Sequence, residues 1–211
     1  RVAGKTREGI RRKQVKYSGM NEFYTPRKIV DCLPVIDLDP CSELDKSIPA
    51  VTHFCWPEQD GLKRPWEGTV FMNPPYCAGH LPHWCRKAKF EVDSGSAECV
   101  IGLVPARVGS KYWAQYIHGS AEIGFIVGRL KFEVAAGVTS QHNASFDSVF
   151  VLWTADTGET TCQIFKDNLE DSGIQVFWYK HEKKALVDSR AGQPADQGGK
   201  DSRKDQDKIH V

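Results

Sequence analysis

The run Cys99–Val104, Cys-Val-Ile-Gly-Leu-Val, has no charged side chain and no alternation of polar and apolar residues. A strand of this kind is buried on both faces, and such strands belong to parallel sheets covered by helices on either side. Helical spacing over Leu81–Val92 and Lys111–Ile117 supplies helices on both sides of this strand in the sequence. We therefore expect an α/β fold with an open, mostly parallel sheet and helices on both faces.

Further elements fit this expectation. Thr25-Pro26 predicts a helix N-cap followed by proline at the first helical position, and Pro34 ends that helix. The predicted strands besides Cys99–Val104 are Val35–Leu38, Ala50–Trp56, Thr69–Met72, Ala121–Val127 and Ser148–Trp153.

Three groups of polar residues come directly after predicted strands. They are Asp39-Pro40, Glu58 with Asp60, and Asn73–Tyr76. Ligands of open α/β sheets bind beyond the carboxyl ends of the strands, so the fold is expected to gather all three groups at one edge.

The tetrapeptide Asn73-Pro74-Pro75-Tyr76 suits chemistry at an exocyclic or amide nitrogen. The Asn73 side-chain oxygen and the Pro74 carbonyl can accept the two N–H bonds of such a nitrogen and draw it toward tetrahedral geometry. The prolines remove competing donors, and Tyr76 offers an aromatic face to a planar ring. The motif therefore predicts an N-methyltransferase; a plain turn that closes a buried strand is the alternative.

The 211 residues suffice for one domain with a good core. The net charge is only +1, but residues 1–28 hold nine Lys and Arg against two Glu. We expect a basic, flexible arm over 1–20, a catalytic domain over 21–180 and a disordered charged tail over 181–211. The arm either contacts the phosphate backbone of a nucleic acid or is merely solvated.

Seven cysteines without a C-x-x-C pair indicate reduced thiols in a cytosol-like compartment. The cluster Cys77, His80, His83 and Cys85 matches no common zinc module, so we expect no metal. No run of about 18 apolar residues is present, and we expect no membrane partner.

Several motifs in order resemble the phage-type Dam family, which are DNA adenine-N6 methyltransferases that use S-adenosylmethionine. The resemblance covers about residues 21–153 and implies the Rossmann-like class I methyltransferase fold, double-stranded DNA as partner, and a bacterial or phage-infected cytosol or another reducing, DNA-containing compartment. The motifs are Asn21–Pro26, Ile36–Cys41, Asp60–Leu62, Trp66, Asn73–Tyr76, Leu103–Arg107 and Gly128–Phe132.

The resemblance also implies roles for single residues on the cofactor side. Tyr24-Thr25-Pro26 would line the methionine end of S-adenosylmethionine, and Asp39-Pro40-Cys41 would address its amino-acid part. Asp60 would lie near the cofactor adenine, with Glu58 as a rival for a ribose or adenine contact. The chain departs from general methyltransferases at Cys41-Ser42-Glu43, where those enzymes have a glycine-rich turn.

On the DNA side, Asn73–Tyr76 would hold the target adenine after it is flipped out of the duplex. Phe132 would stack on the other face of that base, and Arg129 and Lys131 would meet phosphate. Base reading is expected within residues 128–147, where polar side chains gather. Cytosine-N4 methylation, methylation of RNA or of protein glutamine, and an inactive DNA-binding module stay open as alternatives.

Overall fold

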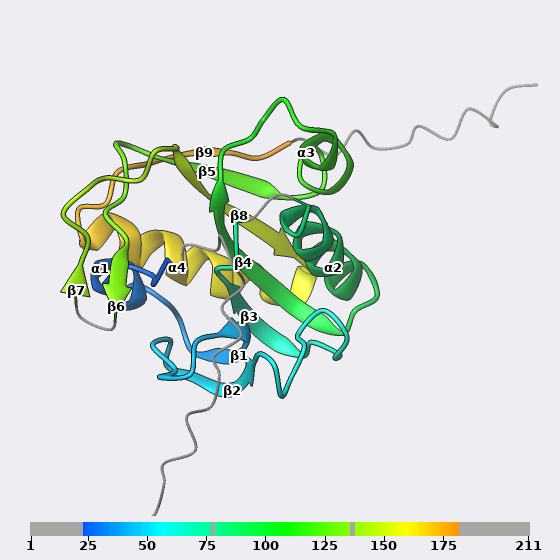
Figure 1. The fold of residues 1–211 in the computed structure, drawn as a ribbon. Helices are drawn as coiled ribbons and strands as arrows, with labels where there is room; N and C mark the ends of the chain where they lie inside the picture. Colours follow the sequence, from blue (N-terminus) through cyan, green and yellow to red (C-terminus); the bar gives the residue numbers. More distant parts are fainter. Residues whose placement is uncertain (1–22, 77–78, 136–137, 182–211) are drawn as a thin grey trace, which may run out of the picture.

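The structure, a computed structural model, describes residues 23–76, 79–135 and 138–181 (Figure 1). The basic arm over 1–20 and all of the predicted tail except His181 lie outside the described residues.

A seven-stranded sheet in the order β2-β1-β3-β4-β8-β5-β9 forms the centre of the fold. β1, β2, β3 and β4 are paired in parallel, and β5 has the same direction because both β4 and β5 are antiparallel to β8. The edge strand β9 is antiparallel to β5. The sheet is thus mostly parallel in strand direction, as predicted. The strands are β1 (Ile36–Ser42), β2 (Ala50–Cys55), β3 (Gly68–Met72), β4 (Ala97–Pro105), β5 (Glu122–Ile126), β8 (Ser148–Thr154) and β9 (Val176–Tyr179).

Helices cover both faces of the sheet (Figure 1). Alternate residues of the central strands point to opposite faces, so Val70 and Met72 belong to one apolar cluster and Phe71 belongs to the other. α2 (Leu81–Asp93) and α3 (Lys111–Tyr116) pack on the first cluster, while α1 (Arg27–Val30) and α4 (Glu159–Asp171) pack on the second. The prediction of helices on both faces is confirmed.

The connections on the β2 side differ from the expected alternation of strands and helices. Residues 43–49 join β1 to β2, and residues 56–67 join β2 to β3, in both cases without a helix. β2 is an edge strand with no fully buried residue, so no apolar surface there requires a covering helix.

Several elements were not predicted from the sequence. Besides α4 and β9 they are a short 3-10 helix at Asp156–Gly158 and a separate hairpin of β6 (Glu133–Ala135) and β7 (Val138–Thr139). The hairpin lies beside α1 in Figure 1, and its first residue, Glu133, pairs with Tyr24 just ahead of α1. Among the described residues, no helix is long and apolar enough to cross a membrane.

Candidate active site

Asn73 follows β3 directly, and hydrogen bonds fix the orientation of its side-chain amide. Nδ2 donates to the backbone oxygen of Phe23 at 2.8 Å and to Oγ1 of Thr25 at 3.0 Å. Both amide hydrogens are therefore used, and the opposite end of the amide, Oδ1, accepts the hydroxyl of Tyr76 at 2.5 Å. A flipped amide would set its oxygen against the Phe23 carbonyl, so the observed orientation is the one that the surroundings favour.

Tyr76 is a neutral hydrogen-bond donor held inside an aromatic cluster. Its hydroxyl has two acceptors, Asn73 Oδ1 and the Leu103 carbonyl at 3.0 Å, and burial raises the pKa of the phenol well above 10. Its ring is only 9% exposed and stacks on Phe23, with a centroid distance of 5.6 Å and an interplanar angle of 29°. Phe132 and Phe146 meet the same ring in T-shaped geometry. One face of Tyr76, predicted to receive a planar substrate ring, is thus covered by Phe23.

The prediction that Thr25 caps the first helix is wrong. The N-cap position of α1 is Pro26, no side chain of the cap itself bonds to the helix, and Thr25 is 2% exposed with its hydroxyl turned to Asn73. The carboxylate of Glu133 serves the helix end instead, because its Oε1 accepts the backbone N–H of Arg27 at 2.9 Å. A distant residue thus frees the Thr25 hydroxyl for the active-site amide.

Asp39 lies inside β1 rather than after it, because β1 continues to Ser42. Its pairing with β2 shifts register between Asp39 and Ser42, where Pro40 has no N–H to donate. The Asp39 side chain is 2% exposed; Oδ1 accepts the Cys41 N–H at 3.2 Å, and Oδ2 has no hydrogen-bond partner among the described residues. Burial raises the pKa of Asp39 from 3.8 to about 7, against the lowering effects of the Cys41 N–H and of the nearby Ser42 and Cys41 side chains.

The strand β1 brings this carboxylate next to the Asn73 turn. The parallel pairing of β1 with β3, in which Leu38 lies opposite Val70, brings Cys41 to the Asn73 turn. Burial together with the charge of Asp39 raises the pKa of the Cys41 thiol. A second carboxyl group, Glu43, has its pKa raised to about 7 by burial and by the Asp39 charge. Sequence reasoning assigned no role to Glu43, whose position after Asp39-Pro40-Cys41 was the available signal.

The loop after β2 also reaches this edge of the sheet. Gly61 packs against the backbone of Pro40 so closely that a Cβ there would lie 1.9 Å from the Pro40 carbonyl oxygen. The neighbouring Asp60 carboxylate accepts the Leu62 N–H at 3.1 Å and pairs with Lys63. The structure therefore brings the loop after β2, which carries Asp60, against Pro40 of β1. Glu58 is exposed, and among the described residues no hydrogen bond or ion pair joins it to Asp39, Asp60 or Asn73.

The family model for DNA N-6-adenine-methyltransferase (Dam) matches residues 18–176. The chain belongs to this family. The protein is accordingly a DNA adenine-N6 methyltransferase, and its dependence on S-adenosylmethionine follows from the family. No curated protein matches the chain significantly.

The residues that the Dam resemblance placed on the DNA side differ in their surroundings. Arg129 is exposed, and its Nε lies 3.4 Å from Oδ1 of Asp147. Lys131 is exposed and has no ion pair in the described part of the chain. Phe132 is 2% exposed and packs on Phe23 at 5.0 Å, so it presents no free face to a base in this conformation.

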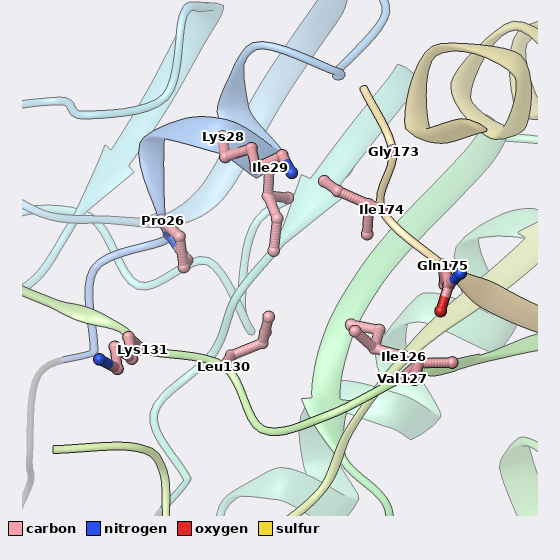
Figure 2. Close-up of a pocket in the computed structure, with 10 residues that line it drawn as sticks. All are labelled: Pro26, Lys28, Ile29, Ile126, Val127, Leu130, Lys131, Gly173, Ile174 and Gln175. Atoms are coloured by element: carbon pink, nitrogen blue, oxygen red, sulfur yellow. The ribbon is translucent and has the colours of Figure 1, made fainter. Parts of the chain in front are cut away.

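Lys131 lines a surface pocket of about 310 Å³ together with Lys28 (Figure 2). The walls are otherwise mostly apolar and come from α1, from the end of β5 and from the segment between α4 and β9. Lys28, like Lys131, has no ion pair within the described residues. Pro26, predicted on the cofactor side, lines this pocket. The other lining residues are Ile29, Ile126, Val127, Leu130, Gly173, Ile174 and Gln175.

No group of three or more His, Cys, Asp or Glu residues that could hold a metal ion occurs among the described residues. Cys77 of the sequence cluster lies outside them, and Cys85 is buried in the core against β3 and β4, with a thiol pKa raised by burial to about 12.

Proposed function

We propose that this Dam-family enzyme binds S-adenosylmethionine beside Asp39 and holds an adenine flipped out of double-stranded DNA at Asn73–Tyr76. The parallel pairing of β1 with β3, in which Leu38 lies opposite Val70, carries this proposal, because it brings the strand with the buried Asp39 beside the strand that leads into the oriented Asn73 amide. The carboxyl ends of parallel strands supply both groups, which supports the Rossmann-like class I methyltransferase fold.

The Asp39 carboxylate suits the ammonium group of the cofactor. Oδ2 is a buried carboxylate oxygen without a hydrogen-bond partner in the described chain, and such an atom is costly unless a donor reaches it. The ammonium group of an amino acid is a donor of the right charge. S-adenosylmethionine would supply the methyl group that is transferred. Tyr24, Thr25, Pro26, Pro40, Cys41, Glu58 and Asp60 remain our proposed further cofactor contacts.

The chain orients and polarises the amino group of the target base. With its Nδ2 anchored on Phe23 and Thr25, Asn73 keeps Oδ1 available to accept one N–H of an exocyclic amine, and the Pro74 carbonyl accepts the other. Two such bonds weaken delocalisation of the nitrogen lone pair into the ring. Pro75 adds no N–H donor to the turn, and Tyr76 donates to Oδ1 without becoming charged. This is preorganisation by fixed dipoles, which needs no general base at the amide.

DNA phosphate would meet Lys131 and Lys28 at the rim of their shared pocket, with Arg129 available once Asp147 releases it. The basic arm over 1–20 would add sequence-independent contacts, and residues 128–147 would read bases. Phe132 stays our proposed second stacking partner, which requires the aromatic cluster to open. We place the enzyme in the cytoplasm, with residues 21–180 as its catalytic domain and 181–211 as its tail.

The test is methylation of adenine-rich duplex DNA with labelled S-adenosylmethionine, followed by nucleoside analysis. We expect N6-methyladenine, and a loss of about 10²–10³ in rate for Asn73→Ala with cofactor affinity nearly unchanged. Asn73→Asp should fail as well, because a carboxylate cannot donate to Phe23 and Thr25. N4-methylcytosine as the product, or a near wild-type rate for Asn73→Ala, would show that the site is misassigned.

A further inference from the structure

Glu133 is a buried carboxylate that lies outside every motif used so far. It opens β6, is 7% exposed, and follows directly on the segment that carries Arg129 and Lys131. Its Oε1 accepts the Arg27 N–H at 2.9 Å. Its backbone exchanges two hydrogen bonds with Tyr24, each 3.1 Å long. Three hydrogen bonds from one residue therefore hold the chain from Tyr24 to Arg27.

That same segment holds the catalytic amide. The Phe23 carbonyl and the Thr25 hydroxyl, one residue on either side of Tyr24, are the two acceptors of Asn73 Nδ2. Phe23 also covers one face of the Tyr76 ring. A displacement of residues 23–25 would therefore turn the Asn73 amide and shift Tyr76.

We propose that Glu133 is a positioning residue for methyl transfer, which acts on Asn73 through residues 23–27. It ties the DNA-facing segment 128–147 to the active-site amide. The proposal rests on the proposed function, because its effect passes through Asn73. Glu133 supplies the acceptor at α1 that a local Thr25 cap would otherwise provide, and it thereby leaves the Thr25 hydroxyl on Asn73.

The test compares Glu133→Ala and Glu133→Gln in the full chain. Loss of the carboxylate should lower kcat by about 10- to 100-fold, since small misplacements of reacting groups cost that much. Dissociation constants for S-adenosylmethionine and for duplex DNA should stay within about threefold, because no contact to either passes through Glu133. The amide oxygen of Gln accepts the same N–H, so Glu133→Gln should recover kcat to within about threefold of wild type.

Glu91→Ala is the matched control. Glu91 is equally buried, at 4% exposed, and pairs with Lys87 on α2, away from residues 23–27. This variant should lower the melting temperature but leave kcat unchanged. If Glu133→Ala and Glu91→Ala lower the melting temperature alike and both leave kcat intact, Glu133 is merely structural and the inference is overturned.

A second route keeps the proposal testable if Glu133→Ala fails to fold. Thr25→Val removes one acceptor of Asn73 without changing side-chain shape and should lower kcat in the same way, and Thr25→Ser, which keeps a hydroxyl, should lower kcat less than Thr25→Val. Combined with Glu133→Gln, Thr25→Val should show no further loss beyond the single variant. If Glu133→Ala does not fold, a near wild-type kcat for Thr25→Val overturns the inference. If Glu133→Ala folds, additive losses between it and Thr25→Val contradict a shared action on Asn73. A normal rate for Asn73→Ala would instead refute the proposed function itself.

Discussion

Cofactor affinity should depend steeply on pH because of Asp39. The carboxyl group has a pKa of about 7 in the free protein, and a bound ammonium group favours its charged form. Cofactor binding should therefore be strongest above about pH 7, where Asp39 is ionised, and should weaken as the pH falls and Asp39 becomes protonated. With that pKa, the ionised fraction falls about 25-fold between pH 7.5 and pH 5.5. The dissociation constant for S-adenosylmethionine should therefore rise by about 25-fold over that range.

Calorimetric titration of wild type, Asp39→Asn and Glu43→Gln across this range separates the two carboxyl groups. At pH 7.5, Asp39→Asn should bind S-adenosylmethionine more weakly than wild type by roughly 1–3 kcal/mol, because the charge-assisted hydrogen bond is lost. The affinity of this variant should hardly change with pH. Glu43 also has a pKa of about 7, so it would titrate in the same window. Glu43→Gln should nevertheless keep the pH dependence, because Oδ2 of Asp39 is the unpartnered atom.

Two results would refute this reasoning. If Asp39→Asn binds as tightly as wild type and keeps the pH dependence, Asp39 does not contact the cofactor. If Glu43→Gln removes the dependence while Asp39→Asn preserves it, the titrating carboxylate is Glu43. Carrying out the same titrations with S-adenosylhomocysteine, which lacks the sulfonium charge, tests whether the amino-acid part is the group that Asp39 addresses.

Two further predictions concern stability and DNA. Raising the pKa of a buried carboxyl group from 3.8 to about 7 costs up to about 4 kcal/mol of folding free energy at high pH. The cofactor-free protein should therefore lose stability as pH rises from about 4 to 7, and Asp39→Asn should be more stable than wild type at pH 8 in denaturant unfolding; a less stable variant would contradict the burial cost. Deleting residues 1–19 should weaken DNA binding without changing sequence preference, and each lost phosphate contact should lower the salt slope by about 0.9. Superimposable salt titrations of full-length and truncated protein would leave the arm without a role.

Local patterns predicted the parts of this molecule that local physics determines. β4 and β3, the strand before Asn73, can be recognised from runs of consecutive apolar residues. Parallel pairing of such strands then places the residues that follow them at one edge of the sheet. α4 could have been predicted too, because Cys162, Phe165 and Leu169 recur at helical spacing and are buried on one face.

The long-range hydrogen bonds of the site could not be predicted from local patterns. Asn73 bonds to Phe23, 50 residues away in sequence, and Arg27 bonds to Glu133, 106 residues away. A Thr-Pro pair predicts a helix N-cap because Thr is a preferred N-cap residue. Here the carboxylate of Glu133, distant in sequence, accepts the N–H at the start of α1 in place of the Thr25 side chain. No pattern in one sequence indicates which distant carboxylate will take this place.

Asp39 shows why the functional carboxylate lies in a strand rather than in a loop. A buried, half-satisfied charge opposes folding, so it persists only where the surroundings determine its position strongly. β1 is hydrogen-bonded to β2 on one side and to β3 on the other, and Gly61 closes on the Pro40 backbone beside it. An exposed loop could move the carboxylate into water and relieve its cost, but it would then lose its fixed position in the strand beside β3. In the strand the carboxylate cannot move into water, so its unsatisfied oxygen remains available to a positively charged group of a ligand.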